Sequence, residues 1–465
     1  MSVTNTSQEC INTILASQKQ YFNTGATLSV DFRKEQLHKL AQALEQFEKP
    51  LADALWTDLH KSYQEAYLTE IGLVKAEIRE HLKGLSRWAR RKRVHTPLTL
   101  FPSSSFVVKE PLGCALIVSP WNYPVQLLLN PLVGAISAGC TAVLKPSPYV
   151  PNVSTVLEQM IKSVFNEKYV AVVQGNREVN KILFSSRFDM IFFTGSPALG
   201  RKVMAAAAEN LTPVVLELGG KSPCIIDNTA NIKLAARRVA WGKTLNAGQT
   251  CIAPDYILIH EDVKEAFIKE FAAQMEYLHG KDIKESGHFV RLVTDKAFER
   301  VTGYLKDGNI VYGGRTDSKE RFIEPTLLDN VKPDAPVMTD EIFGPIFPMI
   351  TIYKKDGQFK DLVTAFIKQR EKPLAFYYFG CAADGWDLIR HTSSGGGCIN
   401  DTIMHIANGN VPFGGVGNSG MGHYHGKLSF DAFTHERSIV KAPTWIDLPF
   451  RYMPYKFFAL IKRMM

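Results

Sequence analysis

The sequence lacks the features that mark secreted, zinc-binding and membrane-spanning proteins. Its seven cysteines are scattered, odd in number and never spaced C-x-x-C, which argues against a disulfide framework and a zinc site. No stretch reaches the roughly 18 uninterrupted apolar residues of a membrane span. The opening MSVTNTSQEC contains no basic segment followed by an apolar run, so no secretory signal is expected. These absences predict a cytoplasmic protein in a reducing compartment.

A strong charge of one sign is also missing. The net charge of +8 over 465 residues is mild, and it is explained by a solubilising surface more simply than by attraction of an anionic ligand such as a dinucleotide. The basic run Arg90–Arg93 has no second basic cluster and no interleaved aromatic residues, so we expect a solvated helix end and no nucleic-acid partner. The length predicts two or three domains.

Hydrophobic periodicity divides the chain. From about Ser29 to Arg93, apolar residues recur at steps of three and four, which predicts scaffold helices. Beyond Pro111, short β-branched runs alternate with helical or turn segments, which predicts a parallel α/β sheet with ligands at the carboxyl ends of its strands. The predicted strands are Cys114–Val118, Thr141–Leu144, Val170–Val173, Met190–Phe193, Val214–Leu216 and Cys224–Ile226, and later Tyr256–His260.

Two stretches carry reactive side chains among small and polar neighbours. NAGQTC, residues 246–251, offers a thiol, and ELGGKSP, residues 217–223, offers a carboxylate at a Gly-Gly turn. A thiol can attack a carbonyl to form a covalent adduct, and a carboxylate can activate the water that releases the product. A lone cysteine is more often a buried hydrophobe, and a Gly-Gly pair more often a simple turn. The glycine and polar residues beside the cysteine favour a site.

Three further motifs follow predicted strands. PWNYP, residues 120–124, comes directly after the first strand and by itself could be a proline-bounded turn. Lys145 stands at the tip of the next strand, where its charge can meet a ribose or phosphate, although a surface lysine is the plainer reading. FTGSPALG lacks the usual G-x-G-x-x-G, but Gly195 permits close approach and Ser196 can cap the following helix, whose free N–H groups suit a pyrophosphate.

The C-terminal third adds two glycine-containing motifs. EIFGP, residues 341–345, has a Glu before an apolar turn, which is usually a cap or a solvated charge. PFGGVGNSGMGHYHG, residues 412–426, is so rich in glycine that its backbone must pack tightly against a neighbouring strand or a site wall. The histidines at 405, 423 and 425 have no carboxylate or cysteine at ligand spacing, so no metal is expected.

These motifs, in this order and at these intervals, resemble those of the aldehyde dehydrogenases, and the C-terminal wording is most similar to class 3 members. The resemblance covers about residues 30 to 440. It implies that Cys251 is the nucleophile, that Glu217 is the general base, and that the Asn122 amide forms the oxyanion hole with the Cys251 N–H. Class 3 members are dimers that act on medium-chain, fatty and aromatic aldehydes.

The resemblance further implies NAD or NADP as cofactor. In the family, EIFGP binds the nicotinamide half, with the Glu on the ribose hydroxyls and the Phe against the ring. The FTGS segment and the following helix bind the pyrophosphate, and the strand-end lysine binds the adenosine ribose. The cofactor candidates are therefore Lys145, Gly195, Ser196, Gly200, Trp121, Glu341 and Phe343, and the substrate candidate is Tyr123.

The implied fold is α/β, with a Rossmann-like parallel-sheet cofactor domain, a second α/β catalytic domain and a small β oligomerisation arm. Residues 1–95 and 110–216 would form the first domain, 217–410 the second, and 96–109 with 411–465 the arm and C-terminal tail. We expect a homodimer. The tail, Tyr455–Met465, joins five consecutive apolar residues to three cations, so it could touch a membrane surface, cap a substrate tunnel or pack on the partner.

The implied reaction oxidises an aldehyde to a carboxylic acid through a thiohemiacetal and a thioester on Cys251. A thiol with a pKa near 8.5 would be only about 3% thiolate at pH 7, so activation by Glu217, the cofactor or local dipoles is expected. Three alternatives compete: an acylating enzyme that passes the thioester to coenzyme A, an acyl-phosphate reductase, and a non-catalytic homologue. An NADH absorbance assay with aldehydes, with and without coenzyme A, separates them.

Pro148 departs from the family pattern, which has a Glu three residues after the strand-end lysine. The missing carboxylate removes both a ribose acceptor and the repulsion that would exclude a 2′-phosphate. We therefore predict weak discrimination between NAD and NADP, measured as the ratio of the two specificity constants. A preference for NAD above roughly a thousandfold, about 4 kcal/mol, contradicts this prediction.

Overall fold

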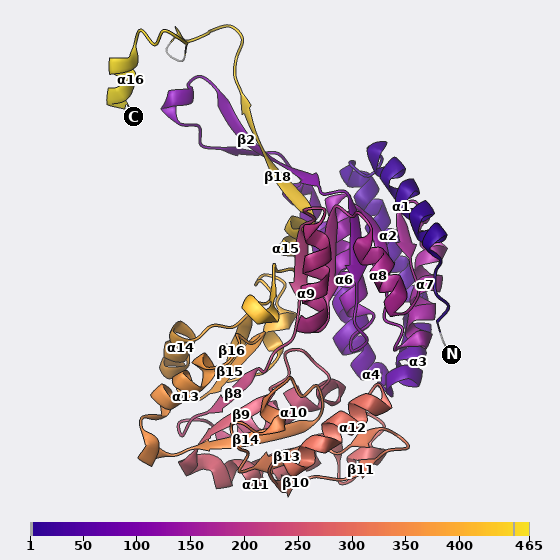
Figure 1. The fold of residues 1–465 in the computed structure, drawn as a ribbon, viewed down its shortest axis with the longest axis vertical. Coiled ribbons are helices and arrows are strands. Elements are labelled where there is room, and N and C mark those ends of the chain that lie inside the picture. The colour runs from indigo at the N-terminus through magenta and orange to yellow at the C-terminus, as the bar shows by residue number, and fades with distance from the viewer. Residues whose placement is uncertain (1–2, 450–451, 465) are drawn as a thin grey trace.

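The β-branched runs beyond Pro111 form the first sheet of the computed structural model, which describes residues 3–449 and 452–464 (Figure 1). Its strand order is β17-β7-β6-β3-β4-β5, and every pair is parallel except the antiparallel β17–β7 pair. The strands are β3 (Cys114–Val118), β4 (Thr141–Lys145), β5 (Val170–Val172), β6 (Met190–Thr194), β7 (Val214–Glu217) and β17 (Gly420–Met421). The predicted α/β fold class is confirmed.

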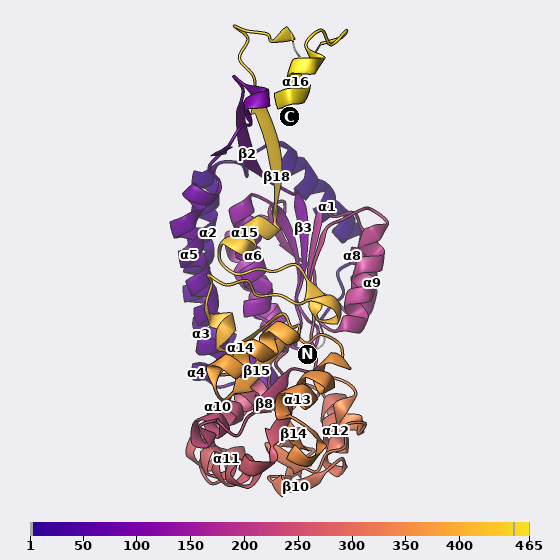
Figure 2. The same ribbon diagram turned by 90° about the vertical axis from the view of Figure 1, so that its left-hand side faces the viewer.

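Helices cover both faces of this sheet (Figure 2). On one side α6 is buried along its whole length beneath α2 and α5, and on the other lie α1, α8 and α9. Burial of the mostly apolar α6 explains why its sequence shows no polar face. The helices are α1 (Gln8–Asn23), α2 (Val30–Gln46), α3 (Glu48–Leu59), α4 (Tyr63–Ala66), a π-helix (Tyr67–Ile71), α5 (Gly72–Trp88), α6 (Gln126–Ala138), α7 (Pro151–Val164), α8 (Arg177–Ser185) and α9 (Pro197–Ala208).

Two segments near the N-terminus differ from the sequence-based expectation. Helix α1 precedes the helical region expected from Ser29, and it begins where the Ser7 hydroxyl accepts a hydrogen bond from the Cys10 N–H. The basic run Arg90–Arg93 does not end a helix, because α5 already stops at Trp88. Instead, Lys92–Val94 forms strand β1, which leaves these cations exposed at the base of the arm.

The second sheet has the order β10-β13-β14-β9-β8-β15-β16 and is parallel except for the antiparallel β10–β13 pair. Helices α10 and α11 pack on each other beside it. The elements are β8 (Pro223–Ile226), α10 (Ile232–Thr244), β9 (Tyr256–His260), α11 (Lys264–His279), α12 (Asp295–Gly303), β10 (Asn309–Tyr312), β13 (Thr326–Asp329), β14 (Ile346–Ile352), α13 (Phe359–Lys368), β15 (Ala375–Phe379), α14 (Ala382–His391) and β16 (Gly396–Ile399), with the small β11 (Thr316–Asp317) and β12 (Phe322–Ile323) hairpin beside them.

A three-stranded antiparallel arm projects from the first body (Figure 1). It contains β1, β2 (Ser104–Pro111) and β18 (Thr434–Lys441), and α16 (Phe458–Met464) lies beyond it. The stretch 411–465, expected as one unit with the arm, is divided: β17 joins the first sheet and α15 (Lys427–Ala432) packs on α6. Of the tail, Met465 lies outside the described residues. Within the described ranges, every helix is too short or too polar to cross a membrane.

The ELGGKSP segment connects the two sheets directly. Strand β7 ends at Glu217 and β8 begins at Pro223, so the Gly-Gly turn passes from one sheet to the other. A side chain at this turn therefore lies where the two α/β bodies meet, which is a common place for a ligand site.

Candidate active site

The predicted site residues of the first sheet lie along one edge. Lys145 is the last residue of β4, Glu217 is the last residue of β7, and PWNYP and Gly195 follow β3 and β6. Strand register puts these ends side by side, because Val118 pairs with Lys145 and Thr194 pairs with Glu217. This is the carboxyl edge of a parallel sheet, where ligands of α/β proteins bind.

An unusual turn delivers Cys251 from the end of α10. Asn246, Ala247 and Gly248 all have positive φ, of 51°, 52° and 75°. Such a conformation costs energy for residues with a Cβ, and it persists only where the surroundings enforce it. Here the buried Gln249 enforces it. The Gln249 side-chain amide donates to Asn246 O at 3.1 Å, and the Gln249 backbone carbonyl accepts from Asn246 Nδ2 at 3.0 Å.

Asn122 lies against the same turn. Its side chain is 2% exposed, and its amide nitrogen donates to Gln249 O at 3.0 Å. A primary amide has two hydrogens, so one remains for a ligand. The neighbouring Tyr123 hydroxyl bonds Thr250 Oγ1 at 2.6 Å. PWNYP is therefore bonded to both residues that precede Cys251, to the backbone of Gln249 and to the side chain of Thr250.

Glu217 is the most exceptional acid of the site. Its side chain is 2% exposed, and neither carboxylate oxygen has a hydrogen-bond partner among the described residues. Burial alone raises its pKa well above the ordinary value. An unpartnered buried carboxyl group indicates that a ligand or water belongs beside it.

Burial also raises the pKa of the Cys251 thiol, and the nearby Glu341 and Glu217 carboxyl groups raise it further. Both acids therefore lie within electrostatic range of the sulfur. The N–H groups of Cys251 and Ile252 lower the pKa of the thiol, but burial and the two carboxyl groups outweigh them, so the net shift disfavours a thiolate. Cys251 nevertheless keeps partial exposure to solvent.

The Glu341 carboxyl group lies directly on the Gly-Gly turn. A Cβ at Gly219 would lie 2.0 Å from Glu341 Oε2, so any larger residue there would displace the Glu341 carboxyl group. Burial, followed by the Asp255 charge, raises the pKa of Glu341 to about 8. Asp255 accepts from the Ile342 N–H at 3.0 Å and forms a salt bridge with Lys221, which fixes EIFGP against ELGGKSP.

Two contacts bring the remaining motifs together. The rings of Trp121 and Phe343 meet edge to face, with centroids 5.4 Å apart. A Cβ at Gly248 would lie 2.4 Å from Gly344 O, so the left-handed turn at residues 246–248, called the nucleophile turn below, touches the EIFGP backbone. PWNYP, NAGQTC and EIFGP thus converge, although they are far apart in the sequence.

The edge beside Lys145 suits a ligand rich in hydroxyl and phosphate groups. The Lys145 ammonium is 1% exposed and donates only to Pro146 O, at 2.8 Å, and burial lowers its pKa to about 8. The Ser119 and Thr194 hydroxyls are also buried, with no partner among the described residues. These unused donors and acceptors fit a dinucleotide.

The candidate helix start lies along the same edge. Ser196 caps α9 by accepting from the Leu199 N–H at 3.4 Å. Gly200 is required by packing, since a Cβ there would come 2.7 Å from the Leu218 side chain. The first N–H groups of α9 are thereby presented at the carboxyl end of β6, as anion binding at a helix terminus requires.

Sequence reasoning missed Tyr424. It is fully buried, and after burial the charges of Glu217 and Cys251 contribute to raising its pKa, so it lies near both. The glycine-rich stretch that holds it was interpreted only as packing; Gly420 indeed pairs with Glu217 in the β17–β7 ladder. The histidines of this region do not assemble a metal site: the described part of the chain contains no group of three His, Cys, Asp or Glu side chains arranged around one.

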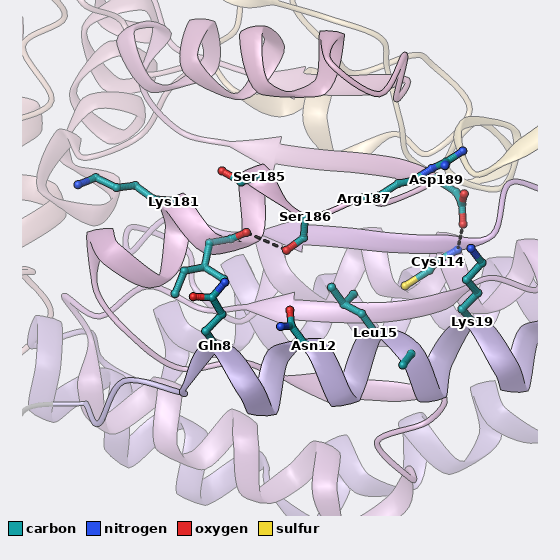
Figure 3. A pocket seen from close by; sticks show the side chains of 12 residues that line it. Gln8, Asn12, Leu15, Lys19, Cys114, Lys181, Ser185, Ser186, Arg187 and Asp189 are labelled. Atoms are coloured by element: carbon teal, nitrogen blue, oxygen red, sulfur yellow. Dashed lines mark hydrogen bonds between the residues drawn. The ribbon is translucent and has the colours of Figure 1, made fainter.

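A cleft of about 840 Å³ lies elsewhere (Figure 3). It opens between α1 and the segment that joins α8 to β6, and Asp189 within it accepts from the Cys114 N–H at 2.8 Å. Cys114 and Asp189 stand at the amino ends of β3 and β6, opposite to the edge that carries the motifs. This cleft therefore takes no part in the candidate site.

Comparison with known proteins agrees with the geometry. A sequence model described as the aldehyde dehydrogenase family matches residues 1–439. The 4,4'-diaponeurosporen-aldehyde dehydrogenase of Staphylococcus aureus is 48% identical over 441 residues, covering 94% of this chain and 95% of its own. Human aldehyde dehydrogenase family 3 member B1 is 42% identical over 439 residues, covering 94% and 93%. A structure of the substrate-bound state of Staphylococcus aureus AldH is 47% identical, with a TM-score of 0.95, and covers 97% and 99%.

The nucleophile turn yields a stability prediction. Gly248→Ala adds a Cβ at φ +75° and drives it into Gly344 O, so we expect a loss of about 3 kcal/mol or more and a lower midpoint of thermal unfolding. Gly287→Ala is the matched control, because Gly287 has φ +68° but no atom within 4 Å of the added Cβ, so about 1 kcal/mol is expected. Equal midpoints for the two variants would show that the Gly248–Gly344 contact does not constrain the turn.

Proposed function

The chain belongs to the aldehyde dehydrogenase family, with class 3 relatives, and on that premise we propose how its own residues oxidise an aldehyde to a carboxylic acid. The observation that carries the proposal is the buried, unpartnered carboxyl group of Glu217 within electrostatic range of the Cys251 thiol. A nucleophile and a base that meet in one place are the two groups that covalent oxidation followed by hydrolysis requires.

In the first step, Cys251 Sγ attacks the aldehyde carbon while the carbonyl oxygen becomes an oxyanion. The second hydrogen of the Asn122 amide and the Cys251 N–H stabilise that charge. The thiol proton passes to the ionised form of Glu217, and burial, which raises the pKa of this carboxyl group, makes that form a stronger base. A nicotinamide cofactor, when bound, accepts the hydride that leaves the thiohemiacetal. The product on the enzyme is a thioester of Cys251.

Before the second step, Glu217 releases the thiol proton to solvent. Water then attacks the thioester, and the ionised Glu217 takes the proton of that water. The carboxylate has no competing hydrogen-bond donor among the described residues, so it is free to orient that water. The carboxylic acid leaves and the thiol is restored. Because deacylation requires the ionised base and burial raises the pKa of Glu217, the steady-state rate should increase as the pH rises through that pKa.

The proposed cofactor is NAD or NADP, held along the carboxyl edge of the first sheet. Support comes from the unused donors of Lys145 and from the capped start of α9 with Ser196, between Gly195 and Gly200. For the nicotinamide half, the Trp121–Phe343 ring pair joins PWNYP to EIFGP, and the Glu341 carboxyl group lies within electrostatic range of Cys251. The Cys251 and Ile252 N–H groups lower the pKa of the thiol but do not offset the upward shift, so a cationic nicotinamide ring is the proposed source of the further activation.

The proposed substrates are medium- or long-chain aliphatic or aromatic aldehydes, with Tyr123 in the substrate path. The name of the Staphylococcus aureus relative, 4,4'-diaponeurosporen-aldehyde dehydrogenase, supports an apolar substrate. The acylating alternative has no support among the relatives. A series from acetaldehyde to hexadecanal, with benzaldehyde, tests the choice, and a higher specificity constant for acetaldehyde than for all longer or aromatic aldehydes contradicts it.

We further propose a cytoplasmic homodimer that assembles through the arm, in which the tail contacts either the partner or a membrane surface. Exposed apolar residues at the arm tip and in the tail support a contact there: Leu98 and Phe101 are 83% and 61% exposed, and Met453 and Phe458 are 79% and 64% exposed. Light scattering at the mass of one chain would exclude the dimer. Loss of vesicle binding on removal of residues 452–465 would assign the tail to membranes.

Two variants separate the chemical steps. Glu217→Gln should still give a single burst of NADH, because hydride transfer precedes deacylation, but steady-state turnover should fall at least 100-fold and lose its rise with pH. Cys251→Ala should give neither burst nor turnover while it still binds NAD. An unaltered steady-state rate in Glu217→Gln removes that residue from the mechanism, and appreciable turnover in Cys251→Ala indicates another nucleophile.

A further inference from the structure

A buried ion pair contacts the loop that carries Asn122, the residue proposed to stabilise the oxyanion. Lys61 and Glu70 are both fully buried, and Lys61 Nζ lies 2.6 Å from Glu70 Oε1. Removing two charges from water costs more than their attraction returns unless further hydrogen bonds satisfy both groups. The pair is therefore weak evidence for stability, and the question is what its remaining bonds hold in place.

The two partners bind PWNYP and the residue that follows it. Lys61 Nζ donates to the backbone carbonyl of Asn122 at 3.1 Å and stands 4.3 Å from the centre of the Tyr123 ring. The second oxygen of Glu70 accepts from the Val125 N–H at 2.8 Å. The ion pair thus holds the loop at Asn122, whose amide is proposed to stabilise the oxyanion, and again three residues later at Val125.

Glu70 occupies a π-helix, Tyr67–Ile71, between α4 and α5. Such single π-turns are rare and occur mainly at functional sites, because the extra residue redirects a side chain. On the preceding turn, Glu65 Oε1 accepts from the Asn246 N–H at 2.7 Å. Asn246 is the first left-handed residue of the nucleophile turn, and its Nδ2 donates to Asn122 O at 2.9 Å.

These bonds form one network with two attachments. The Glu65 carboxyl group fixes the nucleophile turn through Asn246. The Lys61–Glu70 ion pair fixes residues 120–125, the oxyanion loop, through Asn122 and Val125. Asn122 O accepts from both sides, from Lys61 Nζ and from Asn246 Nδ2. The Asn122 loop and the turn that precedes Cys251 are thus both bonded to one short segment, residues 61–70, which does not itself carry the reacting groups.

We propose that Lys61 and Glu70, together with Glu65, are positioning residues that hold the Asn122 amide at the distance from the nucleophile turn at which it can stabilise the oxyanion. The proposal rests on the function proposed above. These side chains act through Asn122 and Asn246 and do not touch the aldehyde. Loss of a whole oxyanion donor lowers kcat about 100- to 1000-fold, so displacement of the donor should have a smaller but measurable effect.

The test is the double variant Lys61→Met with Glu70→Gln, which removes both charges of the buried ion pair together. We expect its NADH burst to slow about 10- to 100-fold, while the KM for aldehyde and the Kd for NAD change less than about threefold. A residue with only a structural role would not move the burst rate while leaving binding intact. Glu70→Gln alone, which keeps an acceptor for the Val125 N–H, should give a smaller effect in the same direction.

Lys75→Met is the matched control. Lys75 on α5 forms an ion pair with Glu48 on α3, in the same helical layer, but neither side chain contacts PWNYP or the nucleophile turn. Its burst rate should equal that of the wild type. An unchanged burst rate in the double variant, or an equal decrease in Lys75→Met, overturns the proposal. A wild-type enzyme that gives no burst with any aldehyde overturns the proposed function instead, so the two failures are distinguishable.

Discussion

The left-handed turn at Asn246, Ala247 and Gly248 is the constraint on which the rest of the site depends. Three consecutive residues at positive φ are not stable on their own, and two of these three carry a Cβ. The turn is maintained because the buried Asn246 side chain bonds to Gln249 across it and because the EIFGP backbone packs directly against Gly248. Because of this turn, the chain leaves the direction of α10 after Thr244. Cys251 therefore lies between the two sheets and not in the core of the second sheet.

Burial then determines the electrostatics of the site. The pKa values of Glu217, Glu341 and Cys251 are all raised, and the pKa of Lys145 is lowered, so every group is shifted toward its neutral form. A neutral site admits an apolar aldehyde at low desolvation cost. The raised pKa of Glu217 makes its ionised form a stronger base, and the raised pKa of the Cys251 thiol means that a thiolate needs further stabilisation.

Much of this architecture could be predicted from the sequence, for identifiable reasons. The parallel strands of the first sheet were predictable because buried parallel strands appear as short β-branched runs, whereas the two-residue β17 was not predicted. Strand β3, and β9 of the second sheet, match their predicted bounds. Motifs at strand ends then followed from the topology of parallel sheets. The close approaches at Gly248 and Gly219 could also be predicted, because a close approach favours glycine and the glycines are read directly from the sequence.

Other features could not be predicted because they depend on tertiary contacts. Lys61 and Glu70 resemble solvated charges in a helical pattern, and only the fold shows that both are fully buried. The left-handed conformation of Ala247 contradicts the propensity of alanine and is imposed by its neighbours. Tyr424 is more than 170 residues from Cys251 in the chain, and β17 is needed to bring its segment beside Glu217.

The proposed reaction depends on the Cys251 sulfur and the Glu217 carboxylate acting on the same acyl group. The most direct test is peptide mass spectrometry of Glu217→Gln quenched after reaction with hexadecanal and NAD. The account predicts that the peptide containing Cys251 carries the mass of the aldehyde minus two hydrogens, since the thiol hydrogen and the hydride have both left. An unmodified Cys251 peptide after a full burst of NADH, or an acyl group on another cysteine, would contradict it.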